Sequence, residues 1–261
     1  MVWVAGHFGE WVQGCTAQSG DVVLVTLPCP SFGASATWQD DPVLSVVDPS
    51  GVVGPARAVA LLSQLGLAAR GRITLATDLP PGGGAGMSSA ALVALARAAG
   101  AAEDRIAAAC LAVEGAVDPL MLSAPDAVLW APRRAVPVRA LPPPPAAEIL
   151  GGFWGAPIAT DPRDTAFPPI DDLIAAWMTG PDLRRAAELA QQSAQRTTAL
   201  RGPADDPTPA LAAQLGALGW ARAHTGSARS LIFAPGAVPA RAEQHLRRAG
   251  FAGVMRFSTR R

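Results

Sequence analysis

Apolar and polar positions alternate over short runs in the first half of the chain, and longer alanine- and leucine-rich stretches lie between these runs. Short apolar runs bounded by glycine, proline or polar residues predict strands, whereas apolar residues repeating three and four apart predict helices. Strands are therefore expected at residues 2–5, 21–27, 32–38, 44–48, 72–77, 127–130 and 135–140. Helices are expected at residues 54–65, 88–99 and 103–117, with Gly100 separating the last two.

A run of consecutive prolines, from Pro142 to Pro145, interrupts this pattern. Because such a run continues neither a helix nor a central strand, it predicts a domain boundary, with one domain at residues 1–145 and a second at 146–261. In the second domain, strands are expected at 148–154, 229–234 and 253–257, and helices at 171–178, 181–200, 209–222 and 239–249. The second half is therefore expected to be a small α+β unit with about three strands.

Composition narrows the function classes. Half of the 261 residues are apolar and the net charge is +0, so neither disorder nor a general affinity for nucleic acid or anionic membranes is expected. All 21 basic residues are arginine, so any cationic clamp must be an arginine or a metal. Three scattered cysteines show no metal or disulfide spacing, and no signal peptide or membrane span is apparent. A cytoplasmic location is therefore expected.

A glycine-rich segment between a predicted strand and a predicted helix carries the clearest chemistry. Glycines let a ligand approach the backbone, and the unpaired N–H groups and dipole of a helix N-terminus favour an anion. The residues expected to hold a nucleotide phosphate are Pro81, Gly82, Gly83, Gly84, Ala85, Gly86, Met87, Ser88 and Ser89. The segment has neither the Walker A ending nor the GxGxxG spacing, and a flexible glycine-rich loop remains the alternative.

Two further segments could complete a site. Residues 6–14 predict a glycine-bracketed polar loop in which His7, Glu10 and Gln13 could line a pocket; an ordinary hairpin loop is the alternative. Glu114 and Asp118 lie one turn apart at the end of a predicted helix. Two carboxylates near a phosphate suit Mg²⁺ binding and base or orienting work on a hydroxyl, whereas solvated helix-end charges are the alternative.

A short polar turn at residues 223–230 contains His224, Thr225 and Gly226. Such a turn can present an imidazole and backbone N–H groups to a ligand. Taken alone, however, it is more typical of a surface turn.

In this order, the three segments resemble the GHMP kinase family, whose Pro-x-x-x-Gly-x-Gly-x-Ser-Ser-Ala-Ala loop matches residues 80–91. Within the family, the chain is most similar to the L-threonine kinases of cobalamin synthesis, also known from propanediol-utilisation gene clusters. Elements of that branch match Gly9-Glu-Trp-Val-Gln-Gly14, the helix end with Glu114, Asp118 and Met121, and the turn at residues 224–227. The loop is one residue shorter than in that branch, and the two acids are one residue further apart.

The resemblance implies an α+β GHMP-kinase fold with two lobes, a ribosomal-S5-like N-terminal half and a ferredoxin-like C-terminal half. It also implies an enzyme that uses ATP and Mg²⁺ to phosphorylate the side-chain hydroxyl of a small metabolite, L-threonine, giving O-phospho-L-threonine. The roles it implies are Asp118 as base, Ser88 and Glu114 on Mg²⁺, and His7, Glu10, Gln13, His224, Thr225 and Gly226 on the substrate, with Arg229 suggested for its carboxylate. The alternatives are a homoserine or isoprenoid-pathway kinase, and a non-catalytic nucleotide-binding relic. The oligomeric state stays open, with a homodimer as one option.

Overall fold

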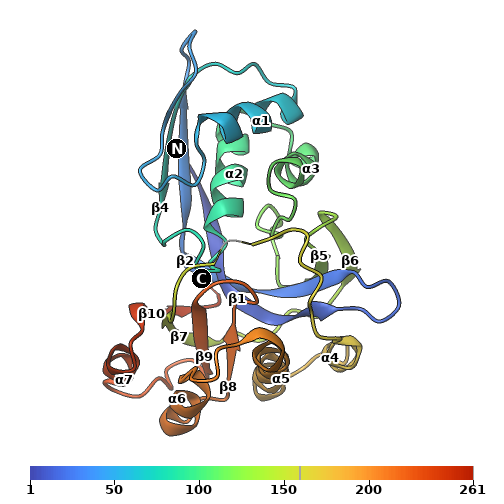
Figure 1. Cartoon of the computed structure of the whole chain (residues 1–261), viewed down its shortest axis with the longest axis vertical. Coiled ribbons are helices and arrows are strands. Elements are labelled where there is room, and N and C mark those ends of the chain that lie inside the picture. Colours follow the sequence, from blue (N-terminus) through green and yellow to red (C-terminus); the bar gives the residue numbers. More distant parts are fainter. Residues whose placement is uncertain (159, 261) are drawn as a thin grey trace.

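Two sheets form the frame of the molecule in the computed structural model, which describes residues 1–158 and 160–260 (Figure 1). The strands of the first sheet are β1 (Val2–Cys15), β2 (Val22–Gln39), β3 (Ser45–Val47), β4 (Arg72–Thr77), β5 (Val128–Ala131) and β6 (Val136–Ala140). Their order is β3-β4-β2-β5-β6, with β1 paired to β2, and every pair except the parallel β3–β4 is antiparallel. The helices of this half are α1 (Pro55–Leu65), α2 (Met87–Ala98) and α3 (Glu103–Glu114).

The second sheet has the connectivity of a ferredoxin-like unit. Its strands are β7 (Glu148–Phe153), β8 (Gly219–Arg222), β9 (Ala228–Phe233) and β10 (Ala252–Ser258), in the antiparallel order β10-β7-β9-β8. The helices are α4 (Asp171–Trp177), α5 (Leu183–Arg201), α6 (Thr208–Leu215) and α7 (Ala242–Arg248). The path from β7 through helices to the β8–β9 hairpin, and through α7 to β10, is the split βαβ arrangement.

The β1–β2 hairpin runs through the middle of the molecule, between the α1–α3 region above and the second sheet below (Figure 1). On β1, Phe8 and Trp11 are fully buried and share one apolar cluster with Ile149 of β7, Trp177 of α4 and Ala190 of α5. A second cluster joins the buried faces of α1, α2 and α3 to the first sheet. The two sheets therefore share a core across the proline segment that separates them in the sequence.

Most predicted elements are confirmed to within a few residues, but three predictions are wrong. Residues 6–14 form no loop: β1 continues through them, with irregular register at positions 5/6, 7/10 and 10/12. The strands expected at 21–27 and 32–38 are a single strand, β2. The helix expected at 209–222 ends at Leu215, because Gly216 takes a left-handed conformation (φ 68°), and the next residues form the unpredicted strand β8.

The end of α3 also differs from the prediction. It lies at Glu114 rather than at residue 117, because Gly115 is left-handed (φ 74°). Asp118 therefore stands beyond the helix, in the segment that leads to β5. Across residues 1–158 and 160–260, no helix has the length and apolar character needed to cross a bilayer.

Candidate active site

The glycine-rich segment connects β4 to α2 and is fixed by its carbonyl groups. Four successive carbonyls each accept a backbone hydrogen bond from another segment: Gly82 from Ile158 (3.1 Å), Gly83 from Ala228 (2.7 Å), Gly84 from Gly9 (3.2 Å) and Ala85 from His7 (3.2 Å). Across the described residues, the N–H groups from Gly82 to Ser89 donate no hydrogen bond to the protein. Unpaired N–H groups at a helix N-terminus form a ready anion site, so the geometry supports the predicted phosphate loop.

Three glycines of this loop, Gly83, Gly84 and Gly86, meet other segments too closely for a side chain. A Cβ on Gly84 would lie 2.2 Å from Cβ of Ala223, and one on Gly86 would lie 2.3 Å from Cδ2 of His7. Gly82, Gly84 and Gly86 also have positive φ (74°, 79° and 69°), a conformation that favours glycine. The loop is thus held between β1 and the turn that follows β8.

At the start of α2, two serines meet the carboxylate that ends α3. Ser88 Oγ donates a hydrogen bond to Glu114 Oε1, and Ser89 Oγ donates to Glu114 Oε2 at 3.1 Å. Burial raises the pKa of Glu114, against the opposing effects of Ser88 and Arg57. A hydroxyl and a carboxylate are hard oxygen donors of the kind that Mg²⁺ prefers, so Ser88 and Glu114 fit a metal at the mouth of the loop.

Arg57, which the sequence analysis missed, completes this group. Its Nη2 atom lies 2.6 Å from Glu114 Oε1 and 3.2 Å from Ser88 Oγ. The residue stands in the first turn of α1, and nothing in the local pattern there marks it as functional. The lack of lysine does demand an arginine near any phosphate, but it does not say which one.

His7, Glu10 and Asp118 form the second group, beside Gly86. His7 Nε2 lies 3.1 Å from Asp118 Oδ2, and His7 Nδ1 lies 3.3 Å from Glu10 Oε1. Ser89 Oγ also lies 3.3 Å from Asp118 Oδ2, so its single hydroxyl proton is shared between that oxygen and Glu114 Oε2, and it accepts a hydrogen bond from the Asp118 backbone N–H at 3.2 Å. The imidazole and the Glu10 carboxyl are almost fully buried, whereas a quarter of the Asp118 side chain is exposed. Asp118 is therefore the member of the group that a substrate can reach.

The three side chains of this group differ in their protonation at neutral pH. Burial lowers the pKa of His7, but the carboxyls of Glu10 and Asp118 outweigh it and raise that pKa to about 9. Burial raises the pKa of Glu10 to about 8. For Asp118, burial is outweighed by His7 and Ser89, and its pKa falls below the usual value. At neutral pH the group is thus an imidazolium between an ionised Asp118 and a protonated Glu10.

The C-terminal turn packs on the phosphate loop rather than on the His7 group. A Cβ on Gly226 would lie 2.7 Å from the Gly83 carbonyl, and the Thr225 carbonyl lies 2.7 Å from a Cβ built on Gly84. His224 is buried and stacks on Phe167 at 3.7 Å between ring centroids. Burial lowers the pKa of His224 to about 3, so its imidazole is neutral.

Two other residues that were predicted to bind substrate make their contacts outside the group of His7, Glu10 and Asp118. Gln13 bonds Ser193 through its backbone, and among the described residues no hydrogen bond joins its side chain to His7 or Asp118. Arg229, suggested for a substrate carboxylate, instead forms a buried ion pair with Asp206 at 2.7 Å.

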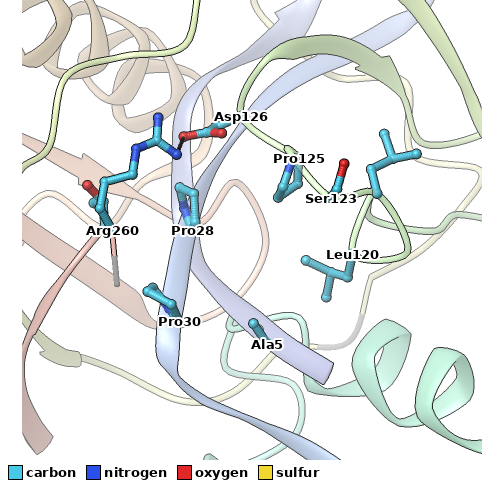
Figure 2. A pocket seen from close by; sticks show the side chains of 11 residues that line it. Ala5, Pro28, Pro30, Leu120, Ser123, Pro125, Asp126 and Arg260 are labelled. Carbon is cyan, nitrogen blue, oxygen red and sulfur yellow. Dashed lines mark ion pairs between the residues drawn. The ribbon is translucent and has the colours of Figure 1, made fainter. Parts of the chain in front are cut away.

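A cavity of about 270 Å³ lies beside Ala5 of β1, between β1, β2 and the segment that contains Leu120 (Figure 2). Its lining includes Gly6, next to His7, and Leu120, close to Asp118 in the sequence. At its rim, Asp126 Oδ2 lies 2.7 Å from Arg260 Nη1, in an ion pair that Figure 2 marks. Among the described residues, the other oxygen of this buried carboxylate, Asp126 Oδ1, has no hydrogen-bond partner.

The overall fold is that of GHMP kinases along the full length of the chain. A phosphomevalonate kinase from Streptococcus pneumoniae matches with a TM-score of 0.67 and 10% identity, covering 99% of both chains. A mevalonate kinase from L. major in complex with R-mevalonate matches with a TM-score of 0.64 and 13% identity, over 98% of this chain and 94% of that one. A homoserine kinase from Cytophaga hutchinsonii matches with a TM-score of 0.59 and 14% identity, over 98% and 93%. No protein-family model and no curated protein sequence matches the chain.

Proposed function

We propose that the protein is a kinase that transfers the γ-phosphoryl group of ATP to the hydroxyl of a small metabolite. The observation that carries this proposal is the placement of an ionised, partly exposed Asp118 directly beside the start of the phosphate loop helix, where Ser89 contacts both Asp118 and Glu114. Phosphoryl transfer needs positioning and charge neutralisation more than covalent chemistry, and this arrangement offers both.

In the proposed reaction, the free N–H groups of residues 83–89 hold the phosphates of ATP. Ser88 and Glu114 would hold Mg²⁺, which would neutralise phosphate charge. Asp118 orients the acceptor hydroxyl and takes its proton as the new oxygen–phosphorus bond forms and the bond to the ADP oxygen breaks. His7, which bonds Asp118, is proposed to position that carboxylate and to keep it ionised.

The acceptor that we propose is L-threonine. The sequence elements at residues 9–14 and 224–227 support this choice over homoserine and the isoprenoid-pathway acceptors. The charged residues that line the nearby cavity add no support for an amino acid, because Asp126 is fully buried and is ion-paired with Arg260. Glu10 is a poor ammonium partner, since it is buried against His7 with a raised pKa.

Assaying several acceptors with MgATP tests this proposal. We expect L-threonine to exceed L-serine in kcat/KM by about tenfold to a few hundredfold, the range for one methyl group in a fitted pocket. Formation of ADP and of the phosphorylated product, the latter followed by ³¹P NMR, measures it. Faster turnover of homoserine or mevalonate would reject threonine but keep the kinase. ATP binding without any product would reject the kinase itself in favour of a nucleotide-binding relic.

The rate should also fall as pH rises through the pKa of His7, about 9. The pKa of His7 in the folded protein lies above the unfolded value of 6.5. The contribution of the protonated imidazole to folding stability is therefore complete below pH 6.5 and is lost as pH rises through 9. We expect the kcat of the wild type to fall above pH 9, and His7→Gln to lower kcat and to lack this alkaline limb.

Glu10 faces the same imidazole and titrates near pH 8, so Glu10→Gln is the matched control for the pH profile. The Glu10→Gln variant should keep an alkaline limb, because His7 still loses its proton, but the limb should shift to lower pH, because the Glu10 carboxylate no longer raises the pKa of His7. An unchanged limb in His7→Gln would show that another group produces it.

A further inference from the structure

Arg57 stands at the phosphate loop although no sequence motif assigns it a role. Among the described residues, it is the one basic side chain with a hydrogen bond to a side chain of residues 82–89. It reaches the loop from α1, a helix whose packing contacts are with the first sheet and with α2 and α3. Its side chain is 35% exposed, whereas the Glu114 side chain that it meets is 9% exposed. The guanidinium therefore lies at the border between the buried carboxylate and the solvent that a nucleotide would displace.

The hydrogen bonds of Arg57 leave donors free. Nη2 is shared between Glu114 Oε1 and Ser88 Oγ, and Nη1 donates to the Val52 carbonyl. A guanidinium has five N–H donors in a planar fork that matches the geometry of phosphate oxygens. A phosphate held by the N–H groups of Ser88 and Ser89 would lie within reach of this fork, because Nη2 already contacts the Ser88 hydroxyl.

Arg57 pairs with Glu114, the same carboxylate that the proposed metal would require. Glu114 Oε1 cannot serve both the guanidinium and a cation at full strength, since each occupies the same oxygen. A bound phosphate chain would supply a new negative partner for the Arg57 guanidinium. Glu114 would then be free to bind the metal ion. No lysine exists to take the role in its place.

We propose that Arg57 is the cationic clamp of the phosphate site, and that its guanidinium exchanges Glu114 for an oxygen of the β- or γ-phosphate when a nucleotide binds. This inference rests on the proposed function and adds to it the residue that supplies fixed positive charge. The class of ligand that it selects is a nucleoside di- or triphosphate, in preference to the nucleoside.

Calorimetry with ADP in the presence of EDTA tests the clamp without metal or turnover. We expect Arg57→Gln to weaken ADP binding about 10- to 100-fold, the range for a lost charge-assisted hydrogen bond. Glu114→Gln should tighten ADP binding, because it removes the competing carboxylate. Arg105→Gln is the matched control, since Arg105 bonds the Gln64 carbonyl at the other end of α1. It should bind ADP like the wild type.

The Arg57→Gln/Glu114→Gln double variant separates a clamp from a merely structural partner of Glu114. It also removes the unpaired buried charge that Arg57→Gln alone would leave, so it guards against misfolding. A clamp predicts that the double variant binds ADP as weakly as Arg57→Gln. Binding equal to that of Glu114→Gln alone would overturn the inference. If the wild type binds neither ADP nor ATP, the proposed function fails instead.

Discussion

Replacing Asp118 by asparagine is expected to lower kcat about 10²–10⁴-fold, the range for a positioned general base. Asparagine keeps the size of the side chain and a carbonyl oxygen for His7, but it cannot take a proton from an acceptor hydroxyl. The affinity for ATP should change little, because a carboxylate near phosphates does not help to bind them. Single-turnover rates, ATP calorimetry and the melting temperature of the same variant measure these effects.

Asp104→Asn is the matched control for this variant, because Asp104 is an exposed acid in the first turn of α3. It should leave kcat, ATP affinity and melting temperature near the wild type. An Asp118→Asn enzyme with nearly normal kcat and a lower melting temperature would show that Asp118 only supports the fold. The same result would leave the proposed reaction without its base.

Replacing Gly86 by alanine should reduce ADP affinity by about 100-fold or more. The added Cβ would lie 2.3 Å from Cδ2 of His7 and 3.0 Å from Cδ1 of Leu120, so the loop or the imidazole must move. The same backbone has φ of 69°, where a Cβ costs roughly 1–2 kcal/mol. The melting temperature should therefore fall together with the affinity, which calorimetry and thermal unfolding measure.

Gly100→Ala separates the effect of the crowded Cβ from the effect of the positive φ. Gly100 also has positive φ (80°), but a Cβ there meets nothing within 4 Å. It should lower the melting temperature without changing ADP affinity. If Gly86→Ala bound ADP as well as Gly100→Ala does, the loop would not hold phosphates.

The glycine-rich turn before α2 and the nearness of the two carboxylates to it could be predicted because the sequence signals for them are local. A glycine-rich turn between a strand and a helix can be recognised from a few consecutive residues. Glu114 and Asp118 are near neighbours in the sequence. The roles of these residues remain predictions that the experiments above decide. Their contacts with Ser88 and Ser89 became visible only in three dimensions.

Other features depend on distant partners and were missed for that reason. Arg57 meets Glu114 across 57 positions of sequence. The loop expected at residues 6–14 is part of a strand because pairing with β2 and packing under α5 outweigh its glycines and polar residues. In contrast, the missed strand β8 did have a local signal, since Gly216 is a typical helix-ending residue.

The apolar cluster around the β1–β2 hairpin limits how the protein can open. Phe8 lies edge-on to Phe153 of β7, and Trp11 packs against Trp177 of α4. A hinge between the two halves would expose these rings, and each large apolar side chain costs about 1.5–3 kcal/mol to return to water. Opening the molecule by a hinge between its two halves is therefore expected to be costly, and the two sheets are expected to stay joined.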